Sequence, residues 1–260
     1  MLSLIKYVID KFLPKSPEED EPFWLSEPDD FIYKTIRDKD SKLLTCCILS
    51  ALVYKYKTHV DAACYNWGIT EYIINSDDPD IVYGIFKIDN TVYLVFKGSS
   101  TFEDFTTNIQ FLQIDDDYNI PGKMHLGFYK ALFEDDVYNT ILKNIEKFSM
   151  NGDKICDLKI TGHSLGGAMA SIFDSYYVHN LGILETELIS YGCPRVGDSS
   201  FSNGCKGTRV VNRGDIVTMI PPPLYYRHYN NKLSLGKLWS MPSVKKHSIK
   251  NYYNELKKIK

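Results

Sequence analysis

Residues 157–181, DLKITGHSLGGAMASIFDSYYVHNL, encode a strand, a tight turn and a helix in direct succession. DLKIT predicts a short buried strand, and the apolar residues that recur after GHSLGG predict one face of a helix. Gly162 and Gly166 keep side chains away from the turn, which leaves the hydroxyl of Ser164 exposed at the end of the strand. The N–H groups at the start of the helix can stabilise an oxyanion. The segment therefore favours Ser164 as a nucleophile over a purely structural turn.

A serine nucleophile needs a base, and the base needs a carboxylate that orients it. In α/β proteins with such a turn the chain order is serine, acid, histidine, so only later histidines qualify. His179 lies on the helix that begins at the serine and is badly placed, which leaves His228 and His247 as candidate bases. Asp215 is the favoured acid because it follows the strand-like TRVVN in a proline-stiffened loop. Asp198, which also follows a strand, is the competitor.

Strand-like and helix-like segments alternate along most of the chain. Strands are expected at 81–88, 91–97, 187–192 and 208–212. Helices are expected around 41–57 and as one long element over 125–148. This alternation predicts an α/β fold, a mostly parallel sheet flanked by helices.

The length and the charge set the domain organisation and exclude one class of partner. Of the 260 residues, 44% are hydrophobic, enough for a single α/β domain over 31–260. Residues 1–30 are expected to form an N-terminal helix and an acidic linker or arm, because EEDEPFWLSEPDD is acidic and contains proline. The formal net charge of -3 leaves no basic excess to neutralise phosphates. A nucleic acid is therefore not an expected partner.

The cysteines and the first residues of the sequence bear on its compartment. Six cysteines show no metal-ligand spacing, and the adjacent Cys46 and Cys47 favour reduced thiols over a disulfide framework. MLSLIKYVIDKFLPK lacks the uninterrupted apolar run of a secretory signal, because Lys6 and Asp10 break it. The apolar run at 43–54 is too short to span a bilayer. The sequence therefore predicts an intracellular protein.

Five ordered blocks of the sequence resemble one known family. The blocks are YLVFKGSSTFEDFTTNIQF (93–111), HLGFY (125–129), GHSLGG (162–167), GCPRVGD (192–198) and RVVNRGDIVTMIPP (209–222). In this order they resemble the class 3 lipase family, the fungal-type triacylglycerol lipases. The resemblance covers about residues 80–250 and implies an α/β-hydrolase fold and the cleavage of carboxylic esters.

The resemblance also implies a catalytic triad. Carried over residue by residue, it makes Ser164 the nucleophile, Asp215 the acid and His247 the base. YYRHYNN matches the family's hairpin with a noncatalytic histidine, which places His228 there and leaves HSIKNYY for the base. The implied reaction is acyl transfer through a covalent intermediate, for which neither a metal nor an organic cofactor is expected.

Two backbone N–H groups are expected to bind the oxyanion. One belongs to Leu165, directly after the nucleophile, and the other to Ser99, which resembles the family's oxyanion residue. The sequence departs from the family in having Lys97 before the oxyanion glycine, where arginine is common. The disulfides and signal sequence of secreted members are also not evident.

The segment TFEDFTTNIQFL is expected to act as an amphipathic lid. Its apolar face, which would contact lipid or an acyl chain, consists of Phe102, Phe105, Ile109 and Leu112. The alternative is a fixed amphipathic helix over the core. The expected substrate is a lipid ester, with contact to a membrane or lipid-droplet surface as a further partner. Two other functions stay open: hydrolysis of small or carbohydrate-linked esters, and noncatalytic lipid binding.

Overall fold

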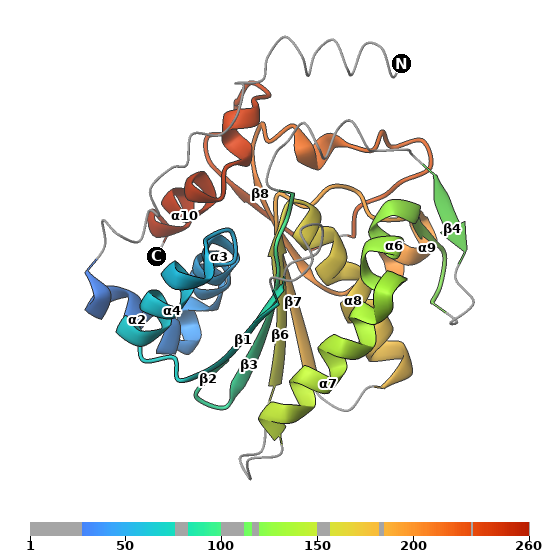
Figure 1. Ribbon diagram of the computed structural model, residues 1–260. Helices are drawn as coiled ribbons and strands as arrows, with labels where there is room; N and C mark the ends of the chain where they lie inside the picture. The colour runs from blue at the N-terminus through green and yellow to red at the C-terminus, as the bar shows by residue number, and fades with distance from the viewer. Residues whose placement is uncertain are drawn as a thin grey trace.

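The computed structural model describes residues 28–75, 83–99, 112–115, 120–149, 157–181, 185–229 and 231–259. Within these ranges a mostly parallel sheet separates two layers of helices (Figure 1). Its strands, in spatial order, are β1 (Glu71–Asn75), β2 (Tyr83–Ile88), β3 (Thr91–Phe96), β6 (Asp157–His163), β7 (Glu185–Tyr191), β8 (Thr208–Asn212) and β9 (Lys232–Leu235). A separate two-stranded sheet pairs β4 (Gln113–Asp115) with β5 (Lys123–His125). The predicted α/β architecture is confirmed.

The direction of the strands changes at β3. β1, β2 and β3 pair antiparallel, and β3 is joined to β2 by a tight turn in which Asp89 has φ 52°. From β3 through β6, β7, β8 and β9 all pairs are parallel. Parallel neighbours need crossover connections, and these connections carry the helices that cover the sheet. The carboxyl ends of the parallel strands therefore meet at one edge of the sheet.

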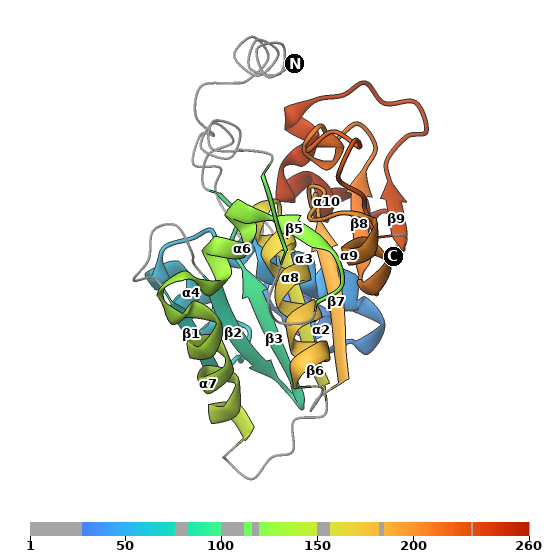
Figure 2. The same ribbon diagram turned by 90° about the vertical axis from the view of Figure 1, so that its right-hand side faces the viewer.

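The helices cover both faces of the sheet. One face carries α2 (Asp29–Arg37), η2 (Lys39–Ser41), α3 (Lys42–Leu52), α4 (Lys57–Asn66) and α10 (Ile249–Lys257). The other carries α6 (Leu126–Phe133), η3 (Glu134–Asp136), α7 (Val137–Ser149) and α8 (Leu165–Asn180), as Figure 2 shows. The remaining short elements are α9 (Ser199–Gly204), η4 (Val217–Met219) and η5 (Val244–His247). Each layer buries its own apolar core against the sheet.

The prediction of one long helix over 125–148 is wrong, because the structure forms two helices there. α6 ends before the acidic segment 134–136, where Asp136 takes φ 60°, and α7 begins at Val137. The apolar spacing continues across this break because both helices pack on the same core. The helix predicted around 41–57 is shorter than expected, since α3 ends at Leu52 and a separate helix, α4, begins at Lys57.

The first described residues bear on the predicted domain boundary. α2 begins at Asp29, so a boundary at residue 30 falls inside its first turn, and Ile32 of this helix is fully buried. Residues 1–27 lie outside the described part of the chain, and the division into an arm and a domain stays a prediction. No helix in the described ranges is both long enough and apolar enough to cross a membrane.

Candidate active site

Ser164 occupies the turn between β6 and α8. Its backbone has φ 59° and ψ -127°, a conformation that residues other than glycine rarely adopt. Its N–H donates to the carbonyl oxygen of Tyr191 at the end of β7 (2.9 Å). A Cβ on Gly162 would lie 2.4 Å from the backbone of Gly166, and one on Gly166 would lie 2.2 Å from the carbonyl oxygen of Phe96. Close backbone packing at both glycines thus holds the serine in its strained conformation.

Asp215 follows β8 and is fully buried. Its Oδ2 lies 2.9 Å from Nδ1 of His247 and accepts a hydrogen bond from the Tyr252 hydroxyl at 2.5 Å. Its Oδ1 accepts the N–H of Val217 at 2.9 Å. Burial alone raises the pKa of the Asp215 carboxyl, but the charge of His247 and the three hydrogen bonds outweigh it and lower the pKa below its ordinary value. Asp215 is therefore an anion at neutral pH.

His247 ends η5 and is buried beside this carboxylate. A carboxylate only accepts hydrogen bonds, so Nδ1 of His247 carries the proton and Nε2 is the basic nitrogen. The imidazole packs against the ring of His163, with centroids 4.5 Å apart, and His163 directly precedes Ser164. Gly192, with φ 59°, makes room for the pair, because a Cβ there would lie 2.9 Å from both Asp215 Oδ2 and His247 Nδ1. The structure thus brings the three predicted triad residues to one edge of the sheet.

His163 and Tyr54 support this arrangement, and sequence reasoning missed both. Nε2 of His163 donates to the carbonyl oxygen of His247 (2.6 Å), so its Nδ1 accepts from the hydroxyl of Tyr54 (2.9 Å). Burial, and next the charge of His247, lowers the pKa of His163 to about 3, which keeps the ring neutral. Chain order excluded His163 as the base, but its place beside the nucleophile in GHSLGG was a signal for a structural role.

The loop after β3 passes directly beside the nucleophile. A Cβ on Gly98 would lie 2.3 Å from the Tyr54 hydroxyl and 3.1 Å from Cβ of Ser164. Ser99 is the next residue of this loop, and Leu165 is the first residue of α8 on the other side of the nucleophile. The N–H groups at a helix start carry a partial positive charge. The oxyanion role of Ser99 and Leu165 stays a prediction that this close approach supports.

The competing candidates from the sequence have structural contacts elsewhere. Asp198 caps α9, where its Oδ1 accepts the N–H of Phe201 at 3.0 Å. Nε2 of His228 donates to the carbonyl oxygen of Thr218 at 2.7 Å. His179, in the last turn of α8, lies 2.8 Å from the carbonyl oxygen of a residue one turn earlier. Asp198 pairs with neither of these two histidines, whereas Asp215 pairs with His247.

The predicted lid falls almost entirely outside the described residues. Phe102, Phe105 and Ile109 belong to the undescribed segment 100–111, so the lid and its acyl-binding face stay predictions. Leu112 is described and half exposed, and its carbonyl oxygen accepts from the N–H of Leu126 and from the Tyr226 hydroxyl. Within the described ranges no group of three or more metal-ligating side chains could hold an ion.

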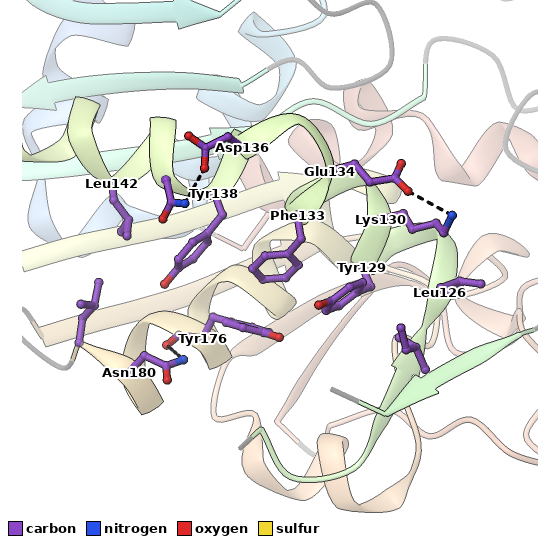
Figure 3. A pocket seen from close by; sticks show the side chains of 13 residues that line it. Leu126, Tyr129, Lys130, Phe133, Glu134, Asp136, Tyr138, Leu142, Tyr176 and Asn180 are labelled. Carbon is purple, nitrogen blue, oxygen red and sulfur yellow. Dashed lines mark hydrogen bonds and ion pairs between the residues drawn. The ribbon is translucent and has the colours of Figure 1, made fainter. Parts of the chain in front are cut away.

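A separate cavity of about 580 Å³ lies between α6, α7 and the C-terminal half of α8 (Figure 3). Its wall includes four aromatic side chains, those of Tyr129, Phe133, Tyr138 and Tyr176, together with aliphatic and polar residues of the three helices and of neighbouring segments. The ion pair between Lys130 and Glu134 (3.1 Å) lies at its rim. No residue of the candidate triad lines this cavity.

The chain is similar to known lipases in sequence and in structure. It matches the lipase (class 3) family over residues 93–225. It is 32% identical over 168 residues to a secreted mono- and diacylglycerol lipase of Malassezia globosa, covering 58% of this chain and 52% of the relative. It is 31% identical over 147 residues to a lipase of Rhizomucor miehei, covering 53% and 39% respectively. The chain therefore matches about half, or less, of the length of these relatives.

One solved structure extends the similarity to the fold. The triacylglyceride lipase of Rhizomucor miehei superposes with a TM-score of 0.63 at 25% identity. The match covers 76% of this chain and 81% of that structure, more of both chains than the sequence alignments cover. The order of strands and the helices on both faces are thus those of an α/β-hydrolase.

The comparison overturns the predicted intracellular location. A relative named as a secreted lipase points to an extracellular location instead. The cysteines were a poor guide, because the five that the structure describes are free and buried in the core. A buried thiol packs as a small apolar side chain, and it does so in any compartment.

The family match extends over half of the chain and contains both Ser164 and Asp215. The superposition with a lipase structure independently supports the α/β-hydrolase fold. Together with the pairing of Asp215 and His247 at the edge that holds Ser164, these observations establish that the chain belongs to the class 3 lipase family.

Proposed function

We propose that this protein is a serine hydrolase that cleaves carboxylic esters of lipids through an acyl-enzyme on Ser164. The observation that carries the proposal is the buried contact between Asp215 and His247, 2.9 Å long, packed against the residue that precedes the serine. An anion buried at Nδ1 stabilises the imidazolium that forms when Nε2 takes up a proton. Ser164 lies in a strained strand-to-helix turn at the same edge of the sheet as His247.

The reaction follows from these positions. Nε2 of His247 takes the proton of the Ser164 hydroxyl as its oxygen attacks the ester carbonyl. The N–H groups of Ser99 and Leu165 stabilise the oxyanion, and each such donor contributes about 3 kcal/mol to lowering the barrier. The alcohol leaves with the proton from His247, and an acyl ester of the serine remains. A water molecule, deprotonated by His247, then releases the carboxylic acid and restores the hydroxyl.

An acylglycerol is the favoured substrate. One relative is named as a mono- and diacylglycerol lipase, and a similar structure is that of a triacylglyceride lipase. In this reading the apolar residues of 102–112 contact the acyl chain or the lipid surface. Hydrolysis of small or carbohydrate-linked esters is the alternative, and a noncatalytic lipid-binding protein is the third.

Covalent labelling and a substrate panel test the proposal together. A fluorophosphonate should label the wild-type protein and leave Ser164→Ala unlabelled. Emulsified triacylglycerol, diacylglycerol and phospholipid, run beside soluble short-chain esters, should show faster turnover of the lipid esters. Labelling without lipid turnover would favour the short-ester hydrolase. If the protein is not labelled and turns over no ester, it is not an enzyme of this kind.

A further inference from the structure

Three large apolar side chains project from one short loop near the candidate active site. The fractions exposed are 72% for Leu238, 91% for Trp239 and 83% for Met241. Single exposed apolar residues are common on protein surfaces, but a tryptophan and two neighbours exposed together mark an interaction site. We refer to residues 237–241 as the KLWSM loop.

The KLWSM loop is held in place by the body of the protein. The guanidinium of Arg213 donates to the carbonyl oxygen of Gly236, directly before the loop, at 2.7 Å. Within the loop, the hydroxyl of Ser240 is hydrogen-bonded to the ammonium of Lys246. After it, the N–H of Ser243 donates to the carbonyl oxygen of the glycine that precedes Asp215, at 2.8 Å. The loop is thus anchored on both sides, and its apolar side chains point away from the protein.

The same loop leads directly into the catalytic machinery. Ser243 forms a parallel β-bridge with Asp215, and η5, which ends at His247, begins at the next residue. In both views the chain that connects β9 to η5 rises beyond the carboxyl ends of the parallel strands (Figures 1 and 2). These strand ends also hold Ser164, so the exposed side chains and the nucleophile share one edge of the sheet.

The charged side chains of the chain segment that contains the loop all have one sign, and the carboxylate of Glu255, which lies near Gly236, is ion-paired with Lys258. The segment 232–250 contains five lysines and no aspartate or glutamate. The lysines are Lys232, Lys237, Lys245, Lys246 and Lys250. Apolar residues, above all tryptophan, flanked by lysines match the boundary between lipid tails and anionic head groups.

The size of the patch favours a lipid layer over a protein partner. Three side chains of this kind bury less than about 750 Å² together, since even a large aromatic residue buries 150–250 Å². A stable protein interface needs about 800 Å² on each partner. A lipid layer requires no such area, because projecting side chains can enter it individually.

We propose that the KLWSM loop inserts into the surface of an anionic lipid layer and so holds the edge that contains Ser164 against the lipid. The proposal rests on the proposed function for its purpose, because a lipid ester is then presented directly to the nucleophile. Binding itself requires no turnover, so the two ideas can fail separately.

The test measures binding of the catalytically inactive Ser164→Ala protein to vesicles of phosphatidylcholine, with and without phosphatidylserine. Cosedimentation should show stronger binding to the vesicles that contain phosphatidylserine. Adding Leu238→Ser and Trp239→Ser should weaken this binding by about tenfold or more, since each removes an apolar side chain that enters the lipid. The matched control adds Tyr56→Ser and Tyr65→Ser, two aromatic residues that are 71% and 86% exposed beside or on α4. The control should bind as the parent does.

A charge variant tests the second half of the proposal. Replacing Lys237, Lys245 and Lys250 by glutamine should remove most of the preference for phosphatidylserine, whereas replacing the exposed Lys39, Lys143 and Lys206 should not. Unchanged binding of the loop variant, or equal loss in its control, would overturn the proposal. So would a wild-type protein that binds no vesicles, or one in which the loop mediates self-association, seen by sedimentation as a dimer that the loop variant abolishes. Fluorophosphonate labelling of the catalytically intact protein reports on the proposed function independently of all these results.

Discussion

The Tyr252 hydroxyl donates a hydrogen bond to Oδ2 of Asp215, the same carboxylate oxygen that His247 contacts. Tyr252 lies on α10, which follows the candidate base in the sequence, so the helix after the base orients the acid. The tyrosine is fully buried, and its oxygen also accepts the N–H of Asn212 (3.2 Å), which ties the carboxylate to the end of β8.

Tyr252→Phe should weaken both stability and catalysis. The change removes a hydrogen bond to a buried anion, which typically contributes about 1.5–3 kcal/mol. The pKa of Asp215 is lowered in the folded protein, so its stabilising contribution exists above the unfolded pKa and is lost as the pH falls through the folded one. Urea unfolding should therefore show a loss of about 2 kcal/mol at pH 7 that shrinks below roughly pH 4. Tyr253→Phe, on the same helix, is the control, and equal losses in both variants would contradict the assignment.

Asp215→Asn should lower kcat on a soluble short-chain ester by roughly 10³–10⁴-fold, because the amide no longer fixes the imidazole tautomer. Asp198→Asn serves as the matched control, since asparagine still caps α9 by accepting the N–H of Phe201. Steady-state kinetics at pH 8 distinguish the two. Comparable losses in both variants would mean that Asp198 contributes to the chemistry.

Gly98→Ala tests the loop that carries Ser99. The added methyl group would lie 2.3 Å from the Tyr54 hydroxyl and 2.6 Å from the carbonyl oxygen of His163, so the loop must shift. Loss of one oxyanion donor should reduce kcat by about 10²–10³-fold. Gly204→Ala, whose new methyl group meets nothing within 4 Å, should keep full activity. A Gly98→Ala protein with normal kcat would remove Ser99 from the mechanism.

Stability should fall as the solution becomes acidic, before most carboxylates titrate. Burial lowers the pKa of His125 to about 4 and, as the leading cause, those of His163 and His228 to about 3. Each folded pKa lies below the unfolded value of about 6.5, so the unfolded chain binds more protons between roughly pH 4 and 6.5. Stability therefore decreases as the pH falls through that window, by up to about 1.4 kcal/mol per pH unit for each histidine. Urea unfolding at pH 7, 6 and 5 measures this slope.

A histidine variant and its control check the origin of the slope. His228→Gln should reduce it by about a third, and His59→Gln should leave it unchanged, because His59 is exposed on α4. A stability that stays level from pH 7 to pH 5 would rule out three neutral buried histidines.

Local signals in the sequence were enough to predict the centre of the fold. The hairpin of β2 and β3 and the strand β6 are short apolar runs next to turn residues, and the mostly apolar segment of α8 follows a glycine-containing turn, so each could be identified from its local sequence. β1 and β9 carry no comparable signal: every residue of β1 is only partly buried, and β9 has four residues at the edge of the sheet. Their pairing depends on neighbours that are distant in sequence, which periodicity does not encode.

Part of the candidate site could likewise be predicted from the sequence, and part of it could not. Ser164 and Asp215 follow strands, so their positions could be predicted, whereas choosing His247 over His228 depended on the family resemblance. The roles of Tyr54 and Tyr252 could not be predicted, because a tyrosine in an apolar pattern typical of a helix is interpreted as a core residue. Only the packing of α10 against the end of β8 brings the Tyr252 hydroxyl to the carboxylate.

The positive φ of Ser164 strains the backbone at the residue that the proposed catalysis requires. Glycine adopts φ 59° without strain, so Ser164→Gly should raise the melting temperature while it abolishes turnover. Ser164→Ala keeps the strain and loses only the hydroxyl, which makes it the closer inactive counterpart of the native protein. Selection for heat resistance alone would therefore favour replacing the nucleophile, and a thermostable variant that keeps its activity must obtain its gain elsewhere in the molecule.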